Sequence, residues 1–143
     1  MQKIFGIFII FLLLHSCNFK DEKEKIVTSS ELIMYQPSEM TILMRRIHEY
    51  NEVVKNQIVN KDSLLVFPDE FTNIYSAVLT DSTERDDEFM ELAKSFIDFQ
   101  KQTFTSYSDS TVYYYNQSIN TCIECHKTRC TGPIPKIKKL LIN

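Results

Sequence analysis

The sequence predicts an all-α protein, and two observations carry the prediction. Glycine and proline, the residues that helices tolerate least, number two and four in 143 residues. Between Pro37 and Thr131 the one such residue is Pro68. Over the same stretch, apolar residues recur at steps of three and four, which is the spacing of one helical face. We therefore expect an antiparallel four-helix bundle, because short connections favour antiparallel neighbours.

Two helices are predicted in the first half of the helical domain. The first runs from about Ser38 to Asn60, since Pro37 and Ser38 suit a helix start. Its apolar face consists of Met40, Leu43, Met44, Ile47, Val54 and Ile58. The second begins near Pro68, because the acidic residues that follow suit a first turn. Its apolar stripe consists of Phe71, Ile74, Tyr75, Val78 and Leu79.

Two more helices are predicted in the second half of the chain. The third follows Asp81-Ser82 and starts with several acidic residues, as the helix dipole favours. Its apolar stripe consists of Phe89, Leu92, Ala93, Phe96 and Phe99. The fourth opens near Asp109 or Ser110, and Gly132 with Pro133 ends it. Its inward face consists of Val112, Tyr115, Ile119, Cys122 and His126.

Residues 1–16 have the layout of a secretory signal peptide. Lys3 supplies a positive charge, and the apolar run that follows is too short to cross a bilayer. Residues 14–17 read Leu-His-Ser-Cys and resemble a bacterial lipoprotein signal, in which the cysteine is acylated. That resemblance implies an exported protein, anchored to the lipid bilayer through Cys17 and facing the periplasm or the cell surface. The alternative is an ordinary signal peptide with a chance cysteine.

The remaining chain is predicted to have three parts. Residues 17–36 form a charged tether, residues 37–131 the helical domain, and residues 132–143 a partly basic, amphipathic tail. The tail either packs back on the domain or docks a partner, and packing is the simpler expectation. The net charge is −3. The sequence has no basic patch of the kind that binds nucleic acid, so no nucleic-acid partner is expected. No nucleophile–base pair stands out, so the sequence does not indicate an enzyme.

The motif that carries chemistry is Cys122-Ile123-Glu124-Cys125-His126. Cys-x-x-Cys-His is the attachment signature of c-type haem. Cysteines three residues apart lie on one side of a helix, so both sulfurs can form thioethers with the vinyl groups of one haem. The adjacent histidine then binds the iron as the proximal ligand. The motif therefore predicts one covalent haem c, held by Cys122 and Cys125 and ligated by His126.

Two other readings of these cysteines stay open. Cys122, Cys125, His126 and Cys130 could bind zinc, although adjacent Cys125 and His126 diverge on a helix. Cys122 and Cys125 could instead form a redox disulfide, but such pairs are expected near a strand–helix unit, and no strand pattern is visible. Cys130 is either a buried free thiol or the site of a disulfide to a partner chain, and a homodimer stays open.

A single haem signature on the last helix of an exported four-helix bundle resembles the cytochrome c′ and cytochrome c-556 family. The resemblance covers about residues 38–130 and depends on the Cys-x-x-Cys-His motif and the helix pattern. It implies a haem inside the bundle, against the first helix. High-spin members leave the sixth iron position open beneath an apolar residue and bind small gases such as NO and CO. Low-spin members fill that position with a methionine from the first helix and transfer electrons.

The resemblance directs attention to the first helix. Met44 is the first candidate for the distal iron ligand and Met40 the second, while Leu43 is the candidate for a non-ligating cover. His48 is a lesser candidate for the same position and is expected to face solvent instead. Arg45 and Arg46 are the candidates for partners of the haem propionates, and the alternative is that they are solvated. The candidates for pocket walls, with core packing as the alternative, are Phe89, Phe96, Phe99 and Tyr115. We therefore expect a monohaem cytochrome that transfers electrons. The sequence does not identify its redox partner. The alternatives are a high-spin gas-binding protein and a non-haem zinc-binding lipoprotein.

Overall fold

The computed structural model describes residues 36–106 and 108–143, so the predictions for the signal peptide, Cys17 and most of the tether lie outside the described residues. Within those residues every regular element is helical, which confirms the all-α prediction. The elements are α2 (Glu39–Asn60), the 3₁₀ helices η1 (Asp69–Tyr75) and η2 (Ser82–Glu84), α3 (Asp87–Thr105), α4 (Ser108–Thr128) and the short α5 (Ile134–Lys138). No helix of these residues is both long and apolar enough to span a membrane.

The first predicted helix is α2, and its bounds agree with the prediction. The Ser38 side chain accepts a hydrogen bond from the Thr41 backbone N–H at 3.1 Å and so caps the first turn. At the other end Lys61 adopts the left-handed conformation with φ 60°, and its N–H donates to the carbonyls of Gln57 and Ile58. Helices often end on such a residue, although glycine is the usual choice.

The second predicted helix is shorter and of another type than expected. Pro68 does precede a helix, but η1 is a 3₁₀ helix that ends at Tyr75. The reason is visible in the next residues: the Met40 N–H donates to the Val78 carbonyl at 3.0 Å, and the Val78 N–H donates to Glu39 Oε2 at 2.9 Å. These bonds tie the segment to the start of α2, and they leave the Val78 side chain 60% exposed instead of on an inner stripe.

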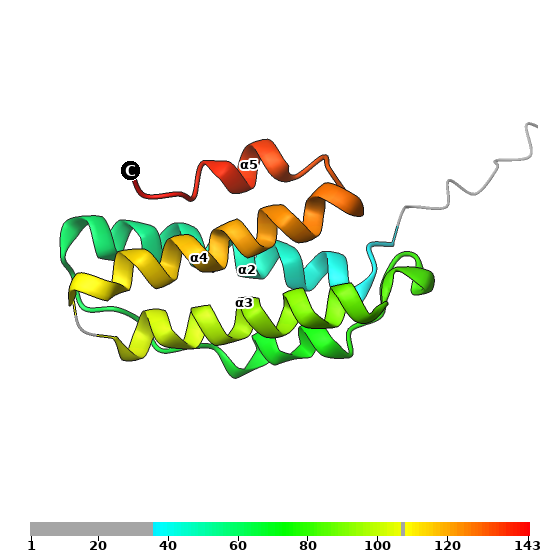
Figure 1. Ribbon diagram of the computed structural model, residues 1–143, viewed down its shortest axis with the longest axis horizontal. Helices are drawn as coiled ribbons and strands as arrows, with labels where there is room; N and C mark the ends of the chain where they lie inside the picture. Colours follow the sequence, from blue (N-terminus) through cyan, green and yellow to red (C-terminus); the bar gives the residue numbers. More distant parts are fainter. Residues whose placement is uncertain (1–35, 107) are drawn as a thin grey trace, which may run out of the picture. The chain divides into compact units, whose positions relative to one another are not determined.

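The third predicted helix starts later than Asp81-Ser82 suggests. Asp81 caps the separate turn η2 through a 2.9 Å bond from the Thr83 N–H. Asp86 then caps α3 by accepting the Phe89 N–H at 2.8 Å, and this bond lowers the pKa of the Asp86 carboxyl. The fourth helix is α4, which lies beside α3 (Figure 1). Val112, predicted to point inward, is 36% exposed.

The apolar core has two parts that meet at α4. The first joins α2, η1 and α3, and the second joins α2, α4 and the tail, while Cys122 packs against both. The first part is built on Met40, Leu43, Ile47, Phe71, Ile74, Ala77, Phe89, Ala93, Phe96 and Ile97. The second part is built on Val54, Tyr115, Ile119, Ile123, Ile137 and Leu140.

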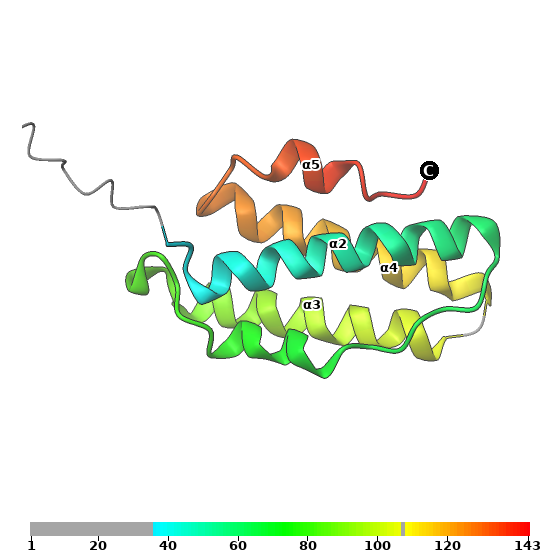
Figure 2. The ribbon, with the colours of Figure 1, turned by 180° about the vertical axis from the view of Figure 1, so that it is seen from behind.

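The tail packs back on the domain, as the simpler expectation has it. Helix α5 lies along α4 and α2 (Figures 1 and 2). Ile137 of α5 and Leu140, just after it, are buried. The Lys55 ammonium of α2 donates to the carbonyls of Lys139 and Leu141 at 2.7 and 2.8 Å. Helix α4 is thus the last long helix but not the last helix, because α5 follows it.

A buried polar layer crosses the domain, and the sequence did not predict it. Gln100 of α3 donates through Nε2 to Asn51 Oδ1 at 2.8 Å and to Ser118 Oγ at 2.7 Å. The Tyr115 hydroxyl donates to the Asn51 carbonyl at 2.9 Å. All four side chains are fully buried, so these bonds fix the relative register of α2, α3 and α4, since a buried polar group left without a partner costs stability.

Candidate cofactor site

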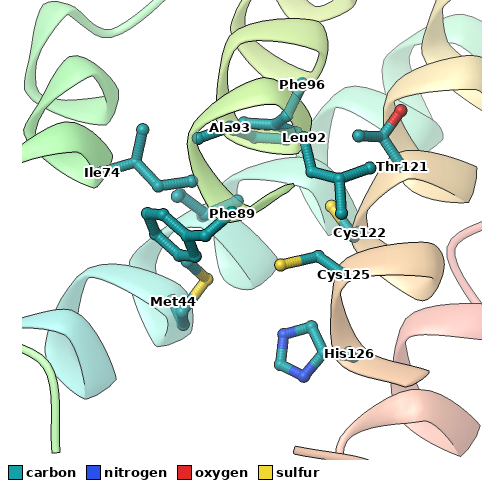
Figure 3. A pocket seen from close by; sticks show the side chains of 11 residues that line it. Met44, Ile74, Phe89, Leu92, Ala93, Phe96, Thr121, Cys122, Cys125 and His126 are labelled. Carbon is teal, nitrogen blue, oxygen red and sulfur yellow. The ribbon is translucent and has the colours of Figure 1, made fainter. Parts of the chain in front are cut away.

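One apolar pocket brings the Cys-x-x-Cys-His motif together with the first long helix. Cys122, Cys125 and His126 of α4 line the pocket with Met44 of α2, and Figure 3 shows Met44 on the opposite side from the motif. The cavity has a volume of about 30 Å³. Its complete lining is Met44, Ile47, Ile74, Phe89, Leu92, Ala93, Phe96, Thr121, Cys122, Cys125 and His126.

Helix α4 runs through the whole motif, so the two cysteines stand one turn apart on one face. Both are free thiols and half-buried. Burial raises the pKa of the Cys122 thiol to about 12. Burial also raises the pKa of Cys125, although the nearby Arg129 guanidinium acts in the opposite direction. Both sulfurs therefore belong to the apolar side of the pocket as neutral thiols.

The His126 ring is oriented by a backbone group beyond the end of α4. Its Nδ1 lies 2.8 Å from the carbonyl oxygen of Cys130. A carbonyl can only accept a hydrogen bond, so this contact requires the proton on Nδ1 and leaves the lone pair on Nε2. Metal-ligating histidines in proteins are commonly held by such a bond from their other ring nitrogen. The Nε2 atom of His126 is thus left with a free lone pair.

The structure distinguishes between the candidates on α2. Met44 is half-buried and lines the pocket, whereas Met40 and Leu43 are buried in the first part of the core and do not line it. Arg45 and Arg46 are exposed, and Arg46 pairs with Glu70 at 2.9 Å. The geometry therefore agrees with Met44 as the first candidate and gives the second candidate, Met40, no place at the pocket.

The expectation that His48 faces solvent is wrong. Its side chain is 12% exposed, and both ring nitrogens are buried without a hydrogen-bond partner among the described residues. The nearest carboxylate is Glu52, whose Oε2 lies 3.8 Å from His48 Nδ1. Which neighbours cover a residue depends on the packing of distant segments, and the sequence of α2 alone does not show them.

Of the four aromatic residues expected to wall the pocket, two do so. Phe89 and Phe96 of α3 line it, whereas Tyr115 lies in the second part of the core and Phe99 does not line the pocket. Sequence reasoning assigned no site role to Ile47 or Ile74, although both lie on predicted apolar stripes. It also missed Thr121, for which the sequence gives no signal.

Arg129 follows α4 and contacts Phe89, which lines the pocket. Its side chain is 9% exposed and donates to the carboxylates of Asp86 and Glu88, the latter at 3.2 Å. The guanidinium also stands 5.8 Å from the centre of the Phe89 ring. Arg129 thus joins the end of α4 to the start of α3, and its guanidinium lies against Phe89 of the pocket lining. The sequence offered only an isolated charge at this position.

Metal-ligating side chains do not gather into a cluster in the part of the chain that the structure describes: no three His, Cys, Asp or Glu residues converge there. The zinc reading needs Cys130 beside the motif. In the structure Cys130 is exposed beyond the end of α4, and it meets His126 through its backbone carbonyl.

No protein-family model, curated protein or solved structure matches this chain.

Thiol reactivity tests the described pocket in protein prepared without cofactor. We expect iodoacetamide to modify exposed Cys130 first and Cys122 last under native conditions. With a pKa of about 12, about one Cys122 thiol in 10⁴ is ionised at pH 8, and the thiolate is the reacting form. Peptide mass mapping after timed alkylation measures the order. Equal rates at Cys122 and Cys130 would show that the pocket is open in solution.

Proposed function

We propose that this protein is a monohaem c-type cytochrome that transfers electrons. Cys122 and Cys125 would hold the haem through thioethers, His126 would ligate the iron, and Met44 would complete its coordination. The observation that carries the proposal is the meeting of these four side chains at one apolar pocket, although Met44 stands almost eighty residues before the motif. We propose no catalysed reaction for these residues.

The chemistry of the donor set fits a haem. Two thiols on one helical face, a histidine with a free Nε2 and a thioether from the facing helix are the groups that low-spin c-type haem uses. The remaining lining is apolar or aromatic except for Thr121, which suits a flat hydrophobic cofactor. The supply of these groups by two helices of one domain supports haem over zinc, for which Cys130 would have to turn inward.

The space must open for the cofactor. The cavity of about 30 Å³ has the volume of about one water molecule in the liquid, whereas sites for larger ligands measure about 300–1,000 Å³. Side chains such as Phe89 and Met44 would have to move apart as the haem enters. Bound haem supplies a one-electron iron couple, and the apolar lining would keep water from the iron and so help to set its potential.

The finer architecture belongs to the same proposal. We infer an antiparallel bundle in which the segment 61–86, with η1, takes the place of the second long helix. The paths of α2, this segment, α3 and α4 in Figures 1 and 2 support the inference. In this arrangement the motif stands on the last long helix. We also propose export and anchoring to a lipid bilayer through acylated Cys17, on the pattern of residues 1–17.

Carbon monoxide separates electron transfer from gas binding. We expect the ferrous, haem-loaded protein to be low-spin and to keep its spectrum under carbon monoxide at neutral pH, because a ligated methionine occupies the binding position. Absorption spectra before and after addition of the gas make the measurement. A rapid spectral change to the carbonyl form would contradict electron transfer through a six-coordinate iron, and would favour the gas-binding alternative.

A further inference from the structure

His48 is a buried imidazole without an evident structural task. Both of its nitrogens are buried and lack hydrogen bonds within the described residues. Such groups are rare in folded proteins, because a buried polar atom without a partner costs about 1–3 kcal/mol. The Glu52 carboxylate at 3.8 Å is too distant for a hydrogen bond. The position therefore calls for an explanation other than packing.

The place of His48 on α2 suggests one. Met44 and Ile47 both line the pocket, and His48 follows Ile47 and stands one turn after Met44 on the same helix. Residues four apart on a helix are neighbours, with Cβ atoms about 5–6 Å apart, and helical side chains lean toward the N-terminal end. His48 is not itself a lining residue, but it lies beside Met44 on α2, one turn further along the helix.

The orientation of the His48 imidazole also suits a metal ligand. The nitrogen near Glu52 is Nδ1, so a small approach of the carboxylate would hold the proton there and leave Nε2 to bind a metal. His126 shows the same pattern, with Nδ1 facing the Cys130 carbonyl. His126, which lines the pocket, and His48, beside Met44, would therefore both offer Nε2.

We propose that His48 is a second distal ligand for the iron, which takes the sixth coordination position when Met44 is displaced or removed. The inference rests on the proposed haem. Helix α2 would then carry two alternative ligands of different kind, a thioether and an imidazole. Because methionine–histidine ligation raises the reduction potential relative to other axial pairs, the exchange would shift the protein to a lower potential without loss of the six-coordinate iron.

The test uses the haem-loaded full chain and three variants. In Met44→Leu we expect the ferric iron to stay low-spin, with the electron paramagnetic resonance of two nitrogen ligands and a lower reduction potential than the wild type. In Met44→Leu/His48→Leu we expect a high-spin iron. Leucine has nearly the volume of methionine, so the fold should tolerate it. His48→Leu alone is the matched control and should keep the wild-type methionine-ligated spectrum.

Carbon monoxide affinity is a second measure of whether His48 binds the iron. If His48 fills the position in at least nine molecules in ten, the double variant should bind the gas at least about ten-fold more tightly than Met44→Leu, because apparent affinity scales with the open fraction. A high-spin Met44→Leu protein with the same gas affinity as the double variant would overturn the inference. A wild-type protein with covalent but high-spin haem would overturn it too and leave the haem itself intact, whereas a chain with no haem would overturn both proposals.

Discussion

We expect replacement of both Cys122 and Cys125 by alanine to remove covalent haem from the purified protein completely. The two thiols are the attachment points that the motif offers, and both lie at the pocket. With one cysteine replaced, one thioether remains, so a single variant should keep haem with one free vinyl group and a red-shifted α band. The measurement is the pyridine haemochrome spectrum of acid-washed protein, made with the haem-maturation machinery.

Cys130→Ala is the matched control for these variants. The Cys130 thiol is exposed and lies outside the pocket, so its removal should leave covalent haem at the wild-type level. Circular dichroism of each variant reports whether the helices are intact. Full haem retention in the double cysteine variant would contradict attachment through the motif, and loss of haem in Cys130→Ala would favour a site that includes this third thiol.

We expect the double substitution Ile137→Ala/Leu140→Ala to lower the free energy of unfolding by about 4 kcal/mol or more. Both side chains are buried in the second part of the core, at 7% and 4% exposure. Truncation of a buried isoleucine or leucine to alanine costs about 2–5 kcal/mol per site, and neighbouring sites need not add. Since small domains are stable by about 5–15 kcal/mol, the loss is a large part of the total.

Urea unfolding followed by circular dichroism measures this effect in protein prepared without cofactor. Lys138→Ala is the control, because Lys138 lies exposed on the same short helix and should change stability by less than about 0.5 kcal/mol. A double variant within about 1 kcal/mol of the wild type would mean that α5 is detached in solution. The tail would then give the pocket no support in solution.

Much of the fold could be predicted because its signals are local. The start of α2 follows from Pro37 and Ser38, and the inward face of α2 from the repeat of Met40, Leu43 and Ile47. The same reasoning gave the wrong length and type for η1, because long-range contacts end this helix. Hydrogen bonds join Val78 to the first turn of α2. Periodicity within a segment carries no information about such partners.

The site divides in the same way. The motif brought Cys122, Cys125 and His126 together in one helical segment, and all three line the pocket. Spacing alone gives the two cysteines a common face. The polar layer was missed because Asn51 stands four residues after Ile47, on the inner face of α2, and an apolar pattern treats such a residue as a gap. His48 was misplaced for the converse reason: a polar residue was assigned to solvent, while its burial depends on the neighbours that pack beside α2.

The most direct test of the proposed function is the pyridine haemochrome spectrum of the wild-type chain, purified after expression with the haem-maturation machinery. A c-type α band that stays with the denatured polypeptide, together with a protein mass raised by one haem, is the expected result. A protein that folds into the same helices but remains colourless would contradict it. Zinc analysis and thiol titration of Cys122, Cys125 and Cys130 would then decide what the motif binds instead.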